Sequence, residues 1–202
     1  RLRGSRVALK VVHPHLAADP DARRRLRREV EAAAHLGGDG LLVPFDLHEL
    51  DGHLVLSLPF HRGRTLSEHV ATRGPMAEAE LRGLGIRLAA ALAEAHGVGV
   101  LHRDVTPANV MVDQDGTDAV LTDFGLARTQ GGTQTRTTGL LGTAGFAGPE
   151  VYMGSRVDPR SDLYGLGGCL YLAASGRPPF DAANPMAALK AQMDDVWEPL
   201  ST

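Results

Sequence analysis

Short hydrophobic runs mark the first part of the chain. Residues 6–12, R-V-A-L-K-V-V, predict a buried strand interrupted by one charge, Lys10. Two further runs, 41–43 and 54–58, predict two more strands, and the Asp-Gly pair at residues 51–52 predicts a tight hairpin turn between them. Buried lysines are rare unless they are paired, so Lys10 is expected to have an acidic partner. The alternative is a strand-end lysine whose amine reaches water.

The next pattern has helical spacing. A helix is predicted over residues 20–36, because an Asp-Pro pair opens the segment and a Gly-Gly pair follows it. At about 100° per residue, four apolar side chains fall on one arc of this helix: Leu26, Val30, Ala33 and Leu36. Glu29 falls inside the same arc, so it is expected to face the core. Glu29 is therefore predicted to be the partner of Lys10.

Helical spacing continues after a short connector. Residues 59–64 predict a linker, and residues 65–72 and 75–95 predict two helices, the second with leucines along one stripe. The expected fold class is α+β, with a small strand-rich N-terminal lobe and a larger helical C-terminal lobe. Ligands bind preferentially in a cleft between such lobes.

The composition of the chain excludes some classes of function. The chain has 202 residues, of which 43% are hydrophobic and 22% charged, and a net charge of −3, so the whole chain has no cationic excess typical of nucleic-acid binding. The Arg-rich stretch 23–28 is interpreted as a solvated helix face, with a phosphate or nucleic-acid patch as the alternative. The single cysteine excludes an internal disulfide, and no apolar run is long enough to span a membrane. We expect no nucleic-acid partner and no membrane contact by this segment.

Candidate catalytic and metal-binding residues concentrate after residue 100. The segment 100–112, V-L-H-R-D-V-T-P-A-N-V-M-V, places polar residues between apolar flanks and then begins a strand. A turn returns the chain through a second strand to Asp123, so the hairpin is expected to bring Asn109 next to Asp123. An amide oxygen and a carboxylate are oxygen ligands of the kind that Mg²⁺ takes from proteins. Asp104 stands close by, where it could accept a proton from a hydroxyl group.

This set of motifs resembles a protein kinase, and more closely a bacterial serine/threonine kinase of the eukaryotic-like family. The matching segments cover nearly the whole chain in the family's order: Val7-Ala8-Leu9-Lys10, His102-Arg103-Asp104 with Asn109, Asp123-Phe124-Gly125, Gly148-Pro149-Glu150 and Ser161-Asp162-Leu163-Tyr164. The resemblance implies a bilobal kinase-like fold. It implies that Asp104 is the catalytic base and that Asn109 and Asp123 are the metal ligands. It also implies that Lys10 binds the phosphates of ATP and forms an ion pair with Glu29.

The resemblance extends to the nucleotide site and to a regulatory segment. It implies that residues 59–64 are the hinge and that Leu56 is the gatekeeper. It also implies that Leu58 forms backbone hydrogen bonds to adenine, with Ala8 and Met111 on the two faces of the ring. Residues 126–148 resemble the activation segment, in which candidate phosphorylation sites are Thr133, Thr135, Thr137 and Thr138. Arg103 could pair with such a phosphate. A Gly/Thr-rich loop that needs no modification is the equally weighted alternative. Thr143 matches the residue that accompanies serine/threonine selectivity.

Two departures from the family pattern bear on activity. Thr106 stands where serine/threonine kinases usually have a lysine that touches the γ-phosphate. The strand motif with Lys10 begins at residue 7, without a preceding Gly-rich loop, so we interpret the chain as a kinase domain truncated at both ends. The expected division is 1–58 for a partial N-lobe, 59–64 for the hinge and 65–202 for a C-lobe without its last helices.

The predicted function is transfer of the ATP γ-phosphate to serine or threonine hydroxyls of protein substrates, with Mg²⁺ as the metal and Mn²⁺ as a substitute. This piece itself is expected to have little activity. The alternative is a pseudokinase or ATP-binding regulatory module, which Thr106 and the absent Gly-rich loop would favour. A third hypothesis is that the protein is a small-molecule phosphotransferase. Further expectations are signalling with autophosphorylation, a homodimer for that reaction, and a cytoplasmic kinase domain whose parent protein could be membrane-anchored.

Overall fold

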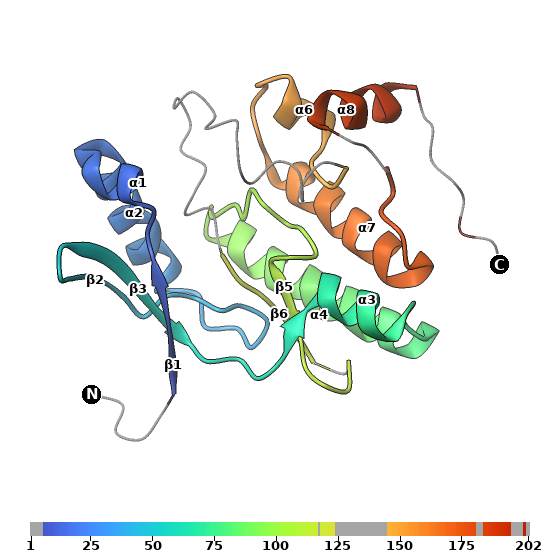
Figure 1. The fold of residues 1–202 in the computed structure, drawn as a ribbon, viewed down its shortest axis with the longest axis horizontal. Coiled ribbons are helices and arrows are strands. Elements are labelled where there is room, and N and C mark those ends of the chain that lie inside the picture. Colours follow the sequence, from blue (N-terminus) through green and yellow to red (C-terminus); the bar gives the residue numbers. More distant parts are fainter. Residues whose placement is uncertain (1–5, 117, 124–144, 181–183, 195–199, 201–202) are drawn as a thin grey trace.

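Two sheets and a set of helices make up the structure, a computed structural model that describes residues 6–116, 118–123, 145–180, 184–194 and 200 (Figure 1). The first sheet has the order β1-β3-β2 and the second the order β4-β5-β6. Most of the helices follow the first sheet in the chain and gather around the second, as expected for an α+β protein.

The first sheet is antiparallel. It consists of β1 (Val7–Val11), β2 (Asp46–Leu50) and β3 (His53–Pro59). The predicted hairpin turn joins β2 to β3, with φ of 49° at Asp51 and 75° at Gly52. Positive φ at both central residues gives the turn a twist that matches the flanking strands. The turn therefore fixes which residues pair across β2 and β3.

The strand predicted at residues 41–43 is wrong in extent and in partner. The first sheet uses the more polar residues 46–50 instead, because these immediately precede the turn and so pair with β3. Leu41 forms one isolated bridge to Leu121 of the second sheet, and Leu42 N donates to the Leu121 carbonyl at 2.8 Å. Residues 41–43, which precede β2 of the first sheet in the chain, thus bind to β6 of the second sheet.

The predicted burial of β1 is also wrong. Val7, Leu9 and Val11 share one face of the strand and are 44%, 60% and 56% exposed. Only the other face is covered, where Ala8 packs on a cluster that joins the sheet to helix α2. The Lys10 side chain is 46% exposed, although it lies on the same face of the strand as Ala8.

Helix α2 (Pro20–Ala33) begins where the sequence predicts and follows the short α1 (Pro14–Ala18). The Asp19 carboxylate accepts a hydrogen bond from Asp21 N at 2.8 Å, which caps the helix start. The predicted apolar arc is buried: Ala22, Leu26, Val30 and Ala33. The helix ends three residues before the predicted residue 36, and Glu94 of helix α4 accepts hydrogen bonds from the amides of Gly37 and Gly38 at 2.8 and 2.9 Å. These bonds tie the end of α2 to the helical part.

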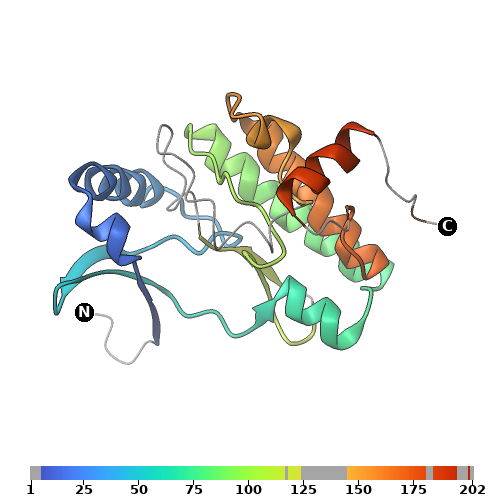
Figure 2. The ribbon, with the colours of Figure 1, turned by 45° about the horizontal axis from the view of Figure 1, so that its top comes forward.

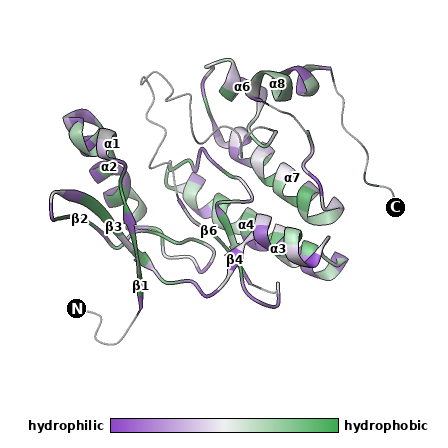
Figure 3. Cartoon of the chain, viewed as in Figure 1, coloured by the Kyte–Doolittle hydropathy of each residue, from purple (hydrophilic) through white to green (hydrophobic). Residues whose placement is uncertain are grey.

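The second sheet packs against helices of the second part of the chain, and its strands β4 (Arg64–Thr65), β5 (Val110–Val112) and β6 (Ala119–Leu121) are antiparallel. The helices of this part are α3 (Leu66–Arg73), α4 (Glu78–Gly97), α6 (Pro149–Tyr152), α7 (Pro159–Ser175) and α8 (Pro185–Met193). Figure 2 shows α4 and α7 running side by side, and both supply residues to one core cluster. Figure 3 shows green, hydrophobic stretches in α4, α7 and β6, and these elements supply buried members of that core. Among the helices of the described residues, none combines the length and apolar content needed to cross a bilayer.

Helix α3 buries a histidine against the turn that joins β5 to β6. His69 is 2% exposed, and a side chain built at Gly116 would lie 3.3 Å from its ring. Burial lowers the pKa of His69, and the nearby Arg73 lowers it further. His69 is therefore buried in its neutral form.

Acidification is expected to destabilise the fold through His69. The unfolded chain binds a proton near the ordinary histidine pKa of about 6.5, whereas the folded chain binds it only at lower pH, so stability falls as the pH drops below that value. The expected slope is at most about 1.4 kcal/mol per pH unit for this one group. Thermal unfolding between pH 7.5 and 5.5 would measure it. His69→Phe should lose less stability over that range than the wild type, whereas the exposed His53→Phe should follow the wild type. Equal losses for all three proteins would contradict the assignment.

Candidate active site

The loop between α4 and β5 carries the predicted catalytic residues in an unusual backbone conformation. Arg103 has a φ of 65°, a region that costs a residue with a side chain about 1–2 kcal/mol. His102 next to it is fully buried, and its Nε2 lies 2.9 Å from the Thr122 carbonyl at the end of β6. Burial lowers the pKa of His102, against an opposing effect of the nearby Asp162 carboxylate. We interpret His102 as a neutral structural residue that joins the loop to β6.

Asp162 of helix α7 holds the loop in this conformation. Its side chain is 1% exposed and accepts hydrogen bonds from His102 N at 2.9 Å and Arg103 N at 2.7 Å. Hydrogen bonds to a carboxylate are about twice as strong as neutral ones, so these bonds offset the strain at Arg103. The Asp162 carboxylate thus anchors the backbone of the loop.

Asp104 follows the anchored residue and is held by Asn109. The Asn109 Nδ2 donates to the Asp104 carbonyl at 2.8 Å and to the Asp104 Oδ2 at 2.9 Å. Because these bonds use the amide nitrogen, the amide oxygen Oδ1 is the side-chain atom of Asn109 that can bind a cation. The two residues that were expected to work together are therefore in contact.

The hairpin of β5 and β6 has the predicted course. Thr122 N donates to the Asn109 carbonyl at 2.9 Å, so Asn109 lies opposite the residue that precedes Asp123. Asp123 also has a positive φ, of 66°. An amide oxygen and a carboxylate from adjoining chain segments are hard oxygen donors, which fit a divalent cation such as Mg²⁺.

The predicted ion pair between Lys10 and Glu29 is wrong for this structure. The Lys10 Nζ lies 2.7 Å from Asp123 Oδ1, and Glu29 Oε1 lies 3.5 Å from Arg103 Nη1. Glu29 does face inward from α2, as its place on the apolar arc indicated, but the group that it meets there is the guanidinium of Arg103. Burial raises the pKa of Glu29, and the charges of Arg103 and Arg25 oppose this effect. Lys10 and Glu29 therefore each have a different partner from the one predicted.

The residues assigned to adenine lie in two different sheets. Leu56 and Leu58 are 1% and 5% exposed in the core between β3 and α2, and Ala8 packs against the same core. Met111 is half-buried in the middle of β5, in the second sheet. Their burial is compatible with plain core residues as well as with nucleotide contacts.

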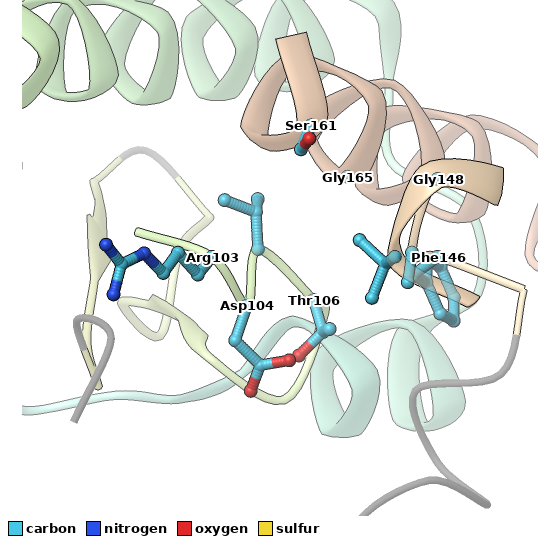
Figure 4. A pocket seen from close by; sticks show the side chains of 10 residues that line it. Arg103, Asp104, Thr106, Phe146, Gly148, Ser161 and Gly165 are labelled. Atoms are coloured by element: carbon cyan, nitrogen blue, oxygen red, sulfur yellow. The ribbon is translucent and has the colours of Figure 1, made fainter. Parts of the chain in front are cut away.

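A pocket adjoins Asp104. It is lined by Arg103, Asp104, Val105, Thr106, Phe146, Ala147, Gly148, Val151, Ser161 and Gly165. Figure 4 shows the side chains of Asp104 and Thr106 directed to the same side of the loop, with Phe146 beyond them. Thr106 is only 4% exposed, so it is part of the wall beside the predicted base.

Several predicted residues lie outside the part of the chain that the structure describes: Phe124, Gly125, Thr133, Thr135, Thr137, Thr138 and Thr143. Conversely, sequence reasoning missed two residues that hold the site. One is Glu94, which binds the end of α2, and the other is His96, whose Nε2 lies 2.7 Å from Asp162 Oδ2. No local pattern indicated either residue, because their partners are at least 56 and 66 positions away in the sequence.

Comparison with known proteins agrees with this geometry. A family model described as "Protein kinase domain" matches residues 1–201. The chain is 36% identical over 193 residues to a probable serine/threonine-protein kinase, PknB, of Corynebacterium glutamicum, an alignment that covers 92% of this chain and 30% of PknB. It is 34% identical over 189 residues to the serine/threonine-protein kinase PknL of Mycobacterium tuberculosis, covering 93% of this chain and 47% of PknL. The chain thus spans less than half the length of these relatives.

A solved structure shares the fold. The crystal structure of the Mycobacterium tuberculosis PknI kinase domain is 34% identical to the chain, with a TM-score of 0.69, and the match covers 87% of this chain and 66% of that one. The predicted α+β class and kinase-like fold are confirmed by this match. The motif order, the anchored loop and the comparisons agree, and the chain belongs to the family of bacterial serine/threonine protein kinases.

Proposed function

We propose that the protein transfers the γ-phosphate of ATP to serine or threonine hydroxyls of protein substrates. The observation that carries the proposal is the position of the Asp104 carboxylate, bound by Asn109 Nδ2 at 2.9 Å and attached to a loop that Asp162 anchors. A fixed carboxylate beside a pocket is what proton acceptance from a substrate hydroxyl requires.

The roles of the site residues follow from this proposal. Asp104 accepts the hydroxyl proton while the substrate oxygen forms a bond to the γ-phosphorus and the bond to the ADP oxygen breaks. Asn109 and Asp123 would hold a divalent metal, Mg²⁺ or in its place Mn²⁺, which neutralises phosphate charge when bound. Lys10 binds the α- and β-phosphates once its amine leaves Asp123.

The nucleotide lies, in this proposal, between the lobes. Residues 1–58 form the N-lobe portion, 59–64 the hinge and 65–202 the C-lobe portion. The adenine contacts are Leu56, Leu58, Ala8 and Met111. We further propose autophosphorylation at Thr133, Thr135, Thr137 or Thr138, serine/threonine selectivity through Thr143, a homodimer for autophosphorylation, and a cytoplasmic kinase domain.

A second candidate function is that of a pseudokinase that binds ATP and regulates a partner. It is favoured by Thr106, which occupies the wall beside Asp104 where the family usually carries a lysine. The two functions are separated by incubating the full-length protein with labelled ATP, Mg²⁺ and a generic serine/threonine substrate. Label transfer supports the kinase proposal. ATP binding without transfer to itself or to the substrate would support the pseudokinase instead.

Restoring a lysine at residue 106 is expected to accelerate phosphate transfer. A well-placed cation near the transferred phosphate is worth about 2–4 kcal/mol, so Thr106→Lys should raise kcat by at least about tenfold. Thr106→Met provides the matched control, because its side chain has similar length without the charge. Initial rates with labelled ATP measure the effect, and melting temperatures show whether the buried position tolerates each side chain. An unchanged or lower rate for a folded Thr106→Lys protein would mean that Thr106 does not limit the rate of phosphate transfer.

A further inference from the structure

One wall of the pocket beside Asp104 is held by a side chain from helix α8. Residues 145–148, the wall segment, include three that line the pocket together with Asp104. The Gln192 Nε2 of α8 donates a hydrogen bond to the carbonyl of Ala147, within this segment, at 2.9 Å. Of the described residues that line the pocket, none belongs to α8. Helix α8 therefore acts on the pocket through this one side chain, from behind the wall.

The place of Gln192 on α8 directs its amide toward the wall segment. Gln192 comes four positions after Ala188, so the two residues share one face of the helix. Ala188 is fully buried, whereas Met193, next to Gln192, is 65% exposed. Helix α8 packs against α6, which begins directly after the wall segment (Figure 1). An amide turned the other way would place its oxygen against the Ala147 carbonyl oxygen, so the hydrogen bond also fixes the orientation of the amide.

Packing fixes the first half of the wall segment. Gly145 has a φ of 98°, and a side chain built there would lie 2.6 Å from the Phe180 carbonyl oxygen. Gly145 N also donates to the Tyr152 hydroxyl of α6 at 3.2 Å. Phe146 is 6% exposed, and its ring lies so close to α7 that a side chain built at Gly168 would be 3.0 Å from it. The hydrogen bond from α8 supplies the corresponding restraint on the second half of the segment.

A protein substrate that reaches Asp104 comes close to this wall. Its hydroxyl has to lie within hydrogen-bond distance of the carboxylate, about 2.6–3.2 Å. Successive residues of an extended chain are only about 3.3–3.6 Å apart, so a side chain next to the acceptor residue reaches the pocket that Asp104 shares with the wall segment. The side chains that this side of the pocket presents are apolar: Phe146, Ala147 and Val151. The wall therefore fits an apolar residue next to the acceptor serine or threonine.

We propose that Gln192 is a positioning residue that sets substrate specificity, because its hydrogen bond holds the wall segment where an apolar residue of the substrate is received. The inference rests on the proposed kinase function. It assigns Gln192 a role in the KM for the protein substrate and in the choice between substrates. It assigns Gln192 no role in ATP binding, because the contact of its amide is with the Ala147 carbonyl of the pocket wall.

Two substitutions in the full-length protein test the role. Gln192→Met keeps the length of the side chain and removes the donor, whereas Gln192→Glu keeps the shape and places a carboxylate oxygen against the Ala147 carbonyl. Gln114→Met makes the same change in the exposed turn between β5 and β6 and is the matched control. Initial rates are measured at varied concentrations of ATP and of short serine peptides, which carry either leucine or alanine next to the serine, on one side or the other.

The expected result is a loss of discrimination between peptides. We expect the wild type and Gln114→Met to prefer a leucine peptide over its alanine counterpart by about tenfold in kcat/KM. Gln192→Glu should reduce this preference to about twofold or less, through a higher KM for the leucine peptide, and Gln192→Met should give an intermediate value. The KM for ATP should change by less than about twofold in all of these proteins.

Amide hydrogen exchange supplies a readout that needs no activity. The amides of the wall segment should exchange faster in Gln192→Glu than in the wild type, with the rest of the chain unchanged. If the wild type transfers no phosphate to any peptide, the kinase proposal fails, while this measurement still decides whether Gln192 holds the wall. The inference is overturned if the wild type does not distinguish leucine from alanine, or if Gln192→Glu keeps the wild-type preference. It is equally overturned if the KM for ATP rises as much as the KM for the peptide, or if exchange is unchanged in the wall segment or accelerates uniformly over the whole chain.

Discussion

Replacing Asp104 by asparagine is expected to lower kcat for phosphate transfer by about 10² to 10⁴-fold while ATP binding stays close to that of the wild type. Asparagine has the shape of aspartate and retains a side-chain oxygen that can accept the hydrogen bond from Asn109 Nδ2. It has no basic carboxylate to receive the proton of the substrate hydroxyl. The substitution therefore removes the base and leaves the architecture of the loop in place.

The loss is measured as the initial rate of label transfer from ATP by full-length proteins, with nucleotide affinity determined separately. Asp115→Asn is the matched control, because Asp115 is an exposed aspartate in the turn of the adjoining hairpin. The control is expected to keep the wild-type rate. Wild-type turnover by Asp104→Asn would remove Asp104 from the role of base and with it the assignment of the loop.

Local sequence patterns predicted the elements whose partners are close in the chain. The apolar arc of α2 and the hairpin of β2 and β3 follow from spacing and from the Asp-Gly turn, and both are present. The strand at residues 41–43 was predicted from composition alone. Leu41 packs in the core of the helical part, and the segment bonds to β6, a partner about eighty residues later in the chain. Hydrophobicity indicated burial there but carried no information about the partner.

The same distinction separates the expected contacts that the structure contains from those that it does not. Asn109 and Asp123 flank one hairpin, so their neighbourhood could be predicted from the turn between them. The partners of Glu29 depend on how α2 lies between β1 and the catalytic loop, which no local pattern determines. Glu29 meets Arg103 at 3.5 Å, and Lys10 meets Asp123 at 2.7 Å. His96 was missed for the same reason, since its partner is 66 residues away in the sequence.

The observed partner of Lys10 leads to the other large expected effect. Lys10→Met is expected to lower kcat/KM for ATP by about 10² to 10³-fold, the usual loss on removing one charge-stabilising group at a transferred phosphate. In the structure the Lys10 Nζ lies 2.7 Å from Asp123 Oδ1, so its ammonium already reaches the carboxylate proposed to hold the metal. Moving from that carboxylate to a phosphate is a short step for a flexible side chain that is 46% exposed.

The composition of the chain offers a clean control for this experiment. Lys10 and Lys190 are its only lysines, and Lys190 is exposed in α8, so Lys190→Met removes the same charge away from the site. Rates at varied ATP concentration, together with binding of a fluorescent ATP analogue, separate weaker binding from slower transfer. Lys10→Arg keeps the charge but presents a planar guanidinium with a different reach, so we expect it to recover only part of the activity. Equal activity of the Lys10→Met and Lys190→Met proteins would show that the ion pair with Asp123 serves the fold and that Lys10 does not touch the phosphates.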